Sequence, residues 1–412
     1  MKTSHRTTGY LYPWDVIDDP GAAERIAGLG LDSITLAAAY HGVRAVTPVH
    51  PRHRFVEARH SALYVPVRPQ VWASAPIQPA SAQPWTGHPD AFGEAKRMLS
   101  EAGVPVAAWV VLTHRDPAEG VRDDGLGGGT EYCVRNAFGD RYRYALCPSQ
   151  PAVVDYARRL VAEVLELGQP AGLVVEACAP LGFNHGHLHD KSAMEGMSGL
   201  EEALLSFCFC PACSQGLADQ GVDAAQLAAR VRQLVREPLP VAPGERSPTP
   251  VEDALGPEAE ALYAVRLSAI ARLWEQVLDQ AADFGGTRVA FHASPGRWRT
   301  GPNSALPVDV LARRPTRIIV PCGDGAQANL ARIDRARRRT SAPLAANVSV
   351  LQNATASSVA VSGETLADHW RQLLAAGVDE LHLYHVGLAS PARFRAVQEA
   401  LADPALARIA AS

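Results

Sequence analysis

The chain has 412 residues, of which 47% are hydrophobic and 20% charged, and its formal net charge is −4. This composition is ordinary for a globular enzyme, and the length exceeds the roughly 250 residues of a bare (β/α)8 barrel. The small negative charge excludes recruitment of nucleic acid or of an anionic membrane by a positive field, and no stretch approaches the roughly 20 apolar residues of a membrane span.

The N-terminus and the cysteines indicate the cellular compartment. Residues 1–16 contain no apolar core of signal-peptide length, so we expect a cytoplasmic protein. The cysteines are odd in number and three of them are closely spaced, which favours metal ligation in a reducing compartment over a disulfide framework. The cysteines are Cys133, Cys147, Cys178, Cys208, Cys210, Cys213 and Cys322.

Short apolar or β-branched runs recur along the chain, separated by segments with helical periodicity. The runs are residues 9–14, 33–39, 104–112, 173–175, 288–291, 317–320, 344–350 and 380–383. The clearest helix is predicted over residues 151–168, where Val153, Ala157 and Leu160 fall on one face and Pro151 suits the first turn.

Alternating strands and helices predict a parallel sheet, and eight such units close naturally into a (β/α)8 TIM barrel. An open doubly wound sheet is the alternative, but no dinucleotide-binding fingerprint is present. We therefore expect residues 1–412 to form a single barrel domain with one core. Its long insertions would be residues 64–89 and 116–144 and a Pro-rich, exposed linker near residues 236–257.

The motif Cys208-x-Cys210-x-x-Cys213 supplies three thiolates within one short loop. Tetrahedral Zn²⁺ needs four ligands, and a site closed by four cysteines has no position for a substrate, so we expect a structural zinc. The fourth ligand must come from elsewhere, and we rank Cys147 first because it directly precedes the helix that leads into strand four. Cys133 is second and Cys178 third.

Glu176 stands where the chain leaves the fourth predicted strand, at the barrel end where such enzymes carry their active sites. Glycoside cleavage usually needs two carboxylates, one to protonate the leaving oxygen and one to attack or to activate water. Asp324, after strand six, and Asp15, after strand one, are the candidates for the second. For each aspartate, a role as the N-cap of the following helix explains its position as well as a catalytic role does.

Three features occur together: a helix begins after Cys147-Pro148, a glutamate ends strand four, and the cysteine motif lies beyond that glutamate. In these three features the chain resembles the family 42 glycoside hydrolases, the zinc-bearing β-galactosidases. The same features are similar to wider groups of uncharacterised glycoside-hydrolase-like barrels. The similarity is specific over residues 147–213 and extends elsewhere only as a barrel. It implies that Glu176 is the general acid/base and that a structural zinc is bound by Cys147, Cys208, Cys210 and Cys213.

Two positions differ from that family. Val175 stands where the family has asparagine, and residues 344–350 contain no carboxylate where the family has its nucleophile. Pairing of carboxylates after strands four and six instead resembles the retaining α-galactosidase-like barrels, in which the strand-four group is the nucleophile. The role of Glu176 therefore stays open between acid/base and nucleophile.

Histidines end four of the predicted strands and would converge on one mouth, which favours a ligand with many hydroxyl groups. Aromatic rings beside them could stack on a sugar face. The expected substrate-binding residues are Trp14, Tyr40, His41, His114, His185, His292, Tyr384 and His385.

The leading hypothesis is thus a glycoside hydrolase that acts on a small carbohydrate, with no nucleic-acid or membrane partner. One alternative is a metal-dependent sugar isomerase, epimerase or lyase, in which His292 and other mouth histidines bind a catalytic metal together with Glu176 and Asp324. A non-catalytic carbohydrate-binding barrel is a third hypothesis. The sequence leaves the sugar, the linkage and the oligomeric state open.

Overall fold

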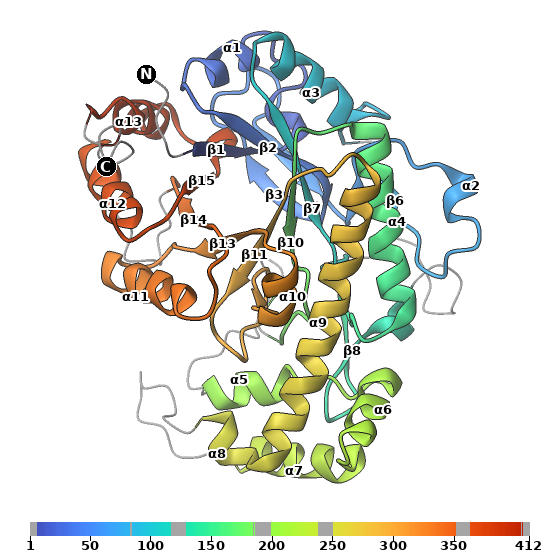
Figure 1. Cartoon of the computed structure of the whole chain (residues 1–412). Helices are drawn as coiled ribbons and strands as arrows, with labels where there is room; N and C mark the ends of the chain where they lie inside the picture. The colour runs from blue at the N-terminus through green and yellow to red at the C-terminus, as the bar shows by residue number, and fades with distance from the viewer. Residues whose placement is uncertain are drawn as a thin grey trace.

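Eight parallel strands close into a barrel in the structure, a computed structural model that describes residues 6–82, 85–116, 129–183, 185, 199–237, 250–351, 363–404 and 406 (Figure 1). The first strand pairs with both the second and the last, which closes the ring. In spatial order the strands are β1 (Arg6–Leu11), β2 (Ser33–Tyr40), β7 (Val106–Val111), β10 (Leu173–Glu176), β11 (Val289–Ser294), β13 (Arg317–Pro321), β14 (Leu344–Ser349) and β15 (Glu380–Tyr384). The predicted TIM barrel is confirmed.

The strands are buried almost throughout because helices cover the outside of the ring and side chains fill the inside. Each of the eight predicted runs overlaps one barrel strand. The first strand is shifted: it was expected over residues 9–14 but ends at Leu11, and Pro13 begins the short 3-10 helix η1 (Pro13–Asp15). Proline has no N–H for a strand ladder and is favoured at the first turn of a helix.

The outer helices follow the strands in sequence. α4 agrees with the predicted helix over residues 151–168 and lies beside the long helix α9 along one side of the barrel (Figure 1). On the inner side of α9, Trp274 stacks on Phe291 of β11 with ring centroids 3.8 Å apart. The outer helices are α1 (Ala22–Ala27), α3 (Ala91–Glu101), α4 (Pro151–Gly168), α9 (Pro257–Asp283), α10 (Val308–Arg313), α11 (Ala326–Arg337), α12 (Gly363–Ala375) and α13 (Pro391–Leu401).

A group of helices gathers below the barrel in Figure 1: α5 (Gly199–Leu205), α6 (Pro211–Asp219), α7 (Ala224–Arg236) and α8 (Val251–Leu255). Together with the start of α9 they bury a second hydrophobic cluster, which includes Phe207, Leu217 and Leu262. Among the described residues, the buried apolar side chains thus form two clusters, where one core was predicted from the sequence. Most of the expected linker, residues 238–249, lies outside the described residues, but its end is folded into α8, where Val251 and Leu255 are buried.

The other insertions contain short elements of their own. The remaining elements are β3 (Val43–Val46), β4 (Phe55–Ala58), β5 (Ala62–Leu63), α2 (Pro69–Trp72), β6 (Ala80–Ser81), η2 (Thr130–Tyr132), β8 (Cys133–Arg135), β9 (Arg141–Leu146), β12 (Ser304–Ala305) and η3 (Val386–Leu388). Residues 117–128 of the second insertion lie outside the described part of the chain. Among the described helices, none is both long and apolar enough to cross a membrane.

Candidate functional site

Glu176 is the last residue of β10, at the carboxyl end of the barrel strands. Its Oε2 accepts a hydrogen bond of 2.8 Å from the indole N–H of Trp109, which points into the barrel from the neighbouring strand β7. The next residue, Ala177, has a left-handed backbone with φ +51°, a conformation that costs a non-glycine residue about 1–2 kcal/mol. Hydrogen bonds of the Ala177 backbone to Pro302 and Thr113 hold this turn, so the carboxylate is fixed in direction.

Burial raises the pKa of the Glu176 carboxyl from 4.5 to about 7, and the hydrogen bond from Trp109 opposes the shift. The side chain still reaches solvent in part. A carboxyl group that holds its proton near neutral pH and remains accessible is suited to general acid/base chemistry.

Three tyrosines surround this carboxylate: Tyr10 from β1, Tyr40 from β2 and Tyr384 from β15. Burial raises the pKa of each phenol, and the negative charge of Glu176 raises it further. Tyr40 also packs edge-on against Trp109, with centroids 4.4 Å apart. The phenols therefore stay protonated and can donate hydrogen bonds around Glu176.

Below this layer the barrel interior is polar and internally paired. The hydroxyl of Tyr10 lies 2.8 Å from Nε2 of His292 and 2.9 Å from Nδ1 of His382. His382 in turn bonds Glu380 at 3.1 Å. Burial, followed by the nearby His382, lowers the pKa of His292 to about 3. His292 is thus a neutral member of a buried network, and within the described residues it does not form the metal site with Glu176 and Asp324 that the isomerase hypothesis requires.

Asp15 lies in a packed layer at the end of β1. Its Oδ2 accepts the backbone N–H of Tyr12 at 2.7 Å and lies 3.9 Å from Nδ1 of His385. Burial raises the pKa of Asp15 to about 7, although the Tyr12 N–H opposes this, and burial lowers the pKa of His385 to about 3. Tyr12 stacks on both His385 and Trp14. Trp14 and His385 are buried, so their predicted role in sugar contact stays a prediction that this packing does not support.

Asp324 has a different environment. Its side chain is 58% exposed and its carboxylate pairs with Arg332 of α11, while its backbone N–H donates to the side chain of Asn329. The structure thus shows the charge of Asp324 engaged on the outer helix that follows β13, unlike the buried carboxyls of Glu176 and Asp15.

Three of the predicted substrate-binding histidines come together with an aspartate that the sequence analysis did not single out. His41 and His114 stack with centroids 4.1 Å apart, and His114 Nδ1 lies 3.1 Å from His185 Nε2. His114 Nε2 lies 3.6 Å from Oδ1 of Asp116. Burial, followed by the proximity of His114, lowers the pKa of His41 to about 3. Tyr40, which was predicted beside them, stacks on His41 at 4.1 Å.

The four cysteines that the sequence analysis grouped are buried, and their sulfur atoms lie within 4.8 Å of one another, so they could hold a metal ion. Cys147 lies 3.5 Å from Cys213 and 3.7 Å from Cys210. The group joins the end of β9 to the start of α6, between the barrel and the helices below it. Cys133, the second choice for the fourth ligand, instead contacts the carbonyls of Gly129 and Arg143.

The surroundings of the cysteines fit a thiolate-bound cation. The backbone N–H of Arg135 donates to the sulfur of Cys208 at 3.4 Å. Arg266 is buried beside the cluster, with Nε and Nη1 lacking hydrogen-bond partners among the described residues. Four thiolates around a divalent ion carry a net charge of −2, which a buried guanidinium would balance.

Sequence reasoning missed Trp109, Tyr10, Tyr12, His382 and Asp116. Four of these lie in or directly beyond strands that were read as apolar runs, where only the terminal residues were considered. A period of two was the available signal, since Tyr10 and Tyr12, or His382 and Tyr384, point to the same face of an extended chain.

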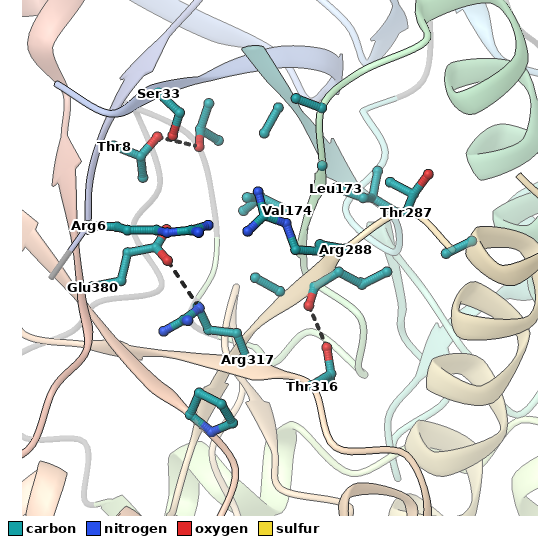
Figure 2. Close-up of a pocket in the computed structure, with 18 of the residues that line it drawn as sticks. Arg6, Thr8, Ser33, Leu173, Val174, Thr287, Arg288, Thr316, Arg317 and Glu380 are labelled. Carbon is teal, nitrogen blue, oxygen red and sulfur yellow. Dashed lines mark hydrogen bonds and ion pairs between the residues drawn. The ribbon is translucent and has the colours of Figure 1, made fainter. Parts of the chain in front are cut away.

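A cavity of about 830 Å³ lies at the opposite, amino-terminal end of the strands. Figure 2 shows Arg6, Arg317 and Glu380 around it, at the starts of β1, β13 and β15. Arg317 Nε bonds Glu380 at 3.1 Å. Barrel enzymes carry their chemistry at the carboxyl end of the strands, so we place the candidate site at Glu176 and not in this cavity.

No protein-family model matches the chain, and no curated protein matches it in sequence. Many solved structures have a similar fold, including the two that follow. The catalytic domain of a β-amylase from Paenibacillus polymyxa is 10% identical with a TM-score of 0.55, over 96% of this chain and 95% of that chain. The glycoside hydrolase domain of PgaB (BpsB) from Bordetella bronchiseptica is 13% identical with a TM-score of 0.55, over 93% of this chain and 94% of that chain. These comparisons show a barrel like those of glycoside hydrolase domains and do not show the resemblance to family 42.

The raised pKa of Glu176 predicts a pH-dependent effect on stability. Between pH 4.5 and about 7 the folded chain keeps a proton that the unfolded chain has lost, so wild-type stability falls as the pH rises, by at most about 1.4 kcal/mol per pH unit from this group. Glu176→Gln should therefore gain stability relative to wild type across this window and reach a plateau above it. Urea unfolding at pH 4.5, 6 and 8 measures this, with the exposed Glu101→Gln as control. A difference that does not vary with pH would contradict the assignment.

Proposed function

We propose that this protein is a glycoside hydrolase in which Glu176 is the general acid/base. The observation that carries the proposal is an accessible carboxyl group at the end of the fourth barrel strand, bound to Trp109 and with a pKa raised to about 7. The names of the two similar structures, a β-amylase and a glycoside hydrolase domain, support a carbohydrate substrate.

In this mechanism the protonated Glu176 donates its proton to the glycosidic oxygen as the bond to the anomeric carbon breaks, and the second carboxylate forms a bond to that carbon. The resulting Glu176 carboxylate then takes a proton from the water that completes hydrolysis. The water then displaces the second carboxylate from the anomeric carbon. The N–H of Trp109 stabilises the carboxylate form, and the phenols around it offer hydrogen bonds to sugar hydroxyls. The expected sugar contacts with solvent access are His41, His114, His185 and Tyr384.

For the second carboxylate we propose Asp15 rather than Asp324, which requires that substrate binding opens the packed layer of Tyr12, Trp14 and His385 in which Asp15 lies. Asp15 is buried at the same end of the barrel, and Tyr12, which it holds, stacks on Trp109 with centroids 5.9 Å apart. Asp324 is exposed and paired with Arg332. A charge neutralised by an arginine outside the barrel gives little stabilisation to an oxocarbenium-like transition state.

We also propose that the metal of the cysteine cluster is zinc. Thiolates are the ligands that Zn²⁺ prefers in closed tetrahedral sites, and such sites stabilise the fold rather than supply chemistry. Its place between β9 and α6 fits a role in joining the lower helices to the barrel.

The acid role predicts how Glu176→Gln changes activity. Turnover of glycosides with poor leaving groups should fall about 10²–10⁴-fold, whereas nitrophenyl glycosides should lose less because their leaving group needs little protonation. Wild-type kcat/KM should decline above pH about 7 as Glu176 ionises. A panel of alkyl and nitrophenyl glycosides tests this. An equal loss on both kinds of substrate would assign Glu176 as nucleophile instead.

The choice between the aspartates has its own test. Asp15→Asn keeps an oxygen to accept the Tyr12 N–H, so the fold should persist while turnover falls at least about 100-fold. Asp324→Asn should stay within about twofold of wild type, since it removes an exposed ion pair worth roughly 0–1 kcal/mol. Both are followed by kcat and melting temperature. The reverse pattern would make Asp324 the partner of Glu176.

The zinc proposal predicts that Cys213→Ser contains one zinc equivalent fewer than wild type and melts at a lower temperature, because metal binding stabilises only the folded chain. Cys133→Ser, another buried cysteine outside the cluster, should keep the wild-type zinc content. Elemental analysis of protein purified without chelator measures both. Equal zinc in wild type and Cys213→Ser would reject the assignment.

A further inference from the structure

A second group of potential metal ligands lies at the mouth of the barrel, apart from the cysteines. The ligand atoms of His41, His114 and Asp116 lie within 4.8 Å of one another. His41 directly follows β2, and the other two follow β7, which pairs with β2 in the barrel. Pairing of β2 with β7 therefore brings the three together from separate parts of the chain.

The other polar atom of each of these side chains is held in place. His41 Nδ1 donates to the carbonyl of Gly42 at 2.7 Å, since a carbonyl can only accept. Asp116 Oδ2 accepts the N–H of Gly42 at 2.8 Å, and His114 Nδ1 contacts His185 at 3.1 Å. In a neutral His41 the proton on Nδ1 leaves the lone pair on Nε2. Metal-binding histidines and carboxylates are typically oriented by such outer contacts.

Gly42 can serve two ligands because it has no side chain. A Cβ at this position would lie 3.0 Å from Asp116 Oδ2 and 3.1 Å from the carbonyl of Ala58. The remaining Asp116 oxygen, Oδ1, lies 3.6 Å from His114 Nε2. Two donor atoms at about 2.1 Å from a tetrahedral ion are separated by roughly 3.4 Å, so the distance between this pair is already close to that of two coordinating atoms. The ring of His41, which stacks on that of His114, must turn to bring its Nε2 to the same ion.

We propose that His41, His114 and Asp116 bind a divalent transition-metal ion at the mouth of the barrel. Two imidazoles and one carboxylate suit Zn²⁺, Co²⁺ or Fe²⁺ and leave coordination positions open. His41 is only half-buried, so an open position can face solvent or a substrate hydroxyl. The site differs from the cysteine cluster in ligand type and place, and it does not depend on glycosidase activity.

The metal would lie beside the candidate acid. The ring of Tyr40 stacks on His41 and packs against Trp109, which binds Glu176. With a metal bound, the sugar contacts proposed for His41 and His114 would be made through the open positions of the ion; if these histidines contact the sugar without a metal, they bind no ion tightly.

The test uses the full-length protein, stripped of metal under reducing conditions and titrated with Co²⁺. Cobalt on thiolates produces a charge-transfer band, whereas cobalt on imidazole and carboxylate produces only weaker visible bands, so the two sites are read separately. Wild type should bind one equivalent more than Asp116→Asn or His41→Gln. In each variant the dissociation constant of this additional Co²⁺ should rise by more than about 100-fold. Loss of a direct ligand weakens binding more than loss of an outer contact, which costs roughly 10–100-fold in affinity.

His53→Gln is the matched control, because His53 pairs with Asp18 on the surface and should bind as wild type does. The thiolate band serves as an internal check that each variant is folded, and His41→Gln, at a half-exposed position, keeps the test valid if Asp116→Asn does not fold. His185→Gln should weaken the second site by about 10–100-fold. Equal cobalt binding in wild type, His41→Gln and Asp116→Asn would overturn the proposal.

Discussion

Pairing of β1 with β2 on one side and β15 on the other makes the ring of strands continuous and encloses the interior in which the candidate site lies. Glu176 and Trp109 face each other because β10 and β7 are neighbours in the ring. Tyr10 reaches His292 and His382 across the interior, over sequence separations that only a closed barrel can bridge. The same ring excludes water, which makes the interior electrostatically sensitive.

The interior of this barrel is unusually rich in rings that carry polar atoms, where branched aliphatic side chains dominate most barrels. Each polar atom there needs a partner, and Tyr10, His292, His382 and Glu380 supply partners to one another. Glu176 lies at the mouth end of this network. Its carboxylate is poorly hydrated there, and the hydrogen bond from the Trp109 indole N–H replaces only part of the lost hydration. Its raised pKa is therefore a consequence of how the interior is filled, and the strained Ala177 backbone fixes where the carboxylate points.

The two groups of potential metal ligands differ in burial and in the number of ligands they offer. The cysteines are buried and four in number, which leaves no open position, and they lie where the barrel meets the second hydrophobic cluster. The histidine and aspartate group has three ligands and partial exposure beside the mouth. A closed thiolate site stabilises a junction between packed elements, whereas an open mixed site can exchange ligands with solvent. Burial and the number of ligands therefore distinguish the two sites: the cysteine site suits a structural role, and the histidine and aspartate site suits a role near the proposed reaction.

Local pattern in the sequence was enough for the barrel, because apolar runs of strand length, period-3.6 hydrophobicity, Pro at helix starts and polar strand ends are all short-range signals. The spacing of Cys208, Cys210 and Cys213 identified three members of the metal-type cluster for the same reason, and Glu176 was evident from its place at a strand end. Tertiary structure alone decided which distant groups meet. It placed Cys147, ranked first from the sequence, in the cluster in preference to Cys133 and Cys178. It also buried Trp14 and His385, turned Asp324 outward and brought Asp116 to His41, because these outcomes depend on which strands are neighbours in the ring and on the packing of loops far apart in the chain.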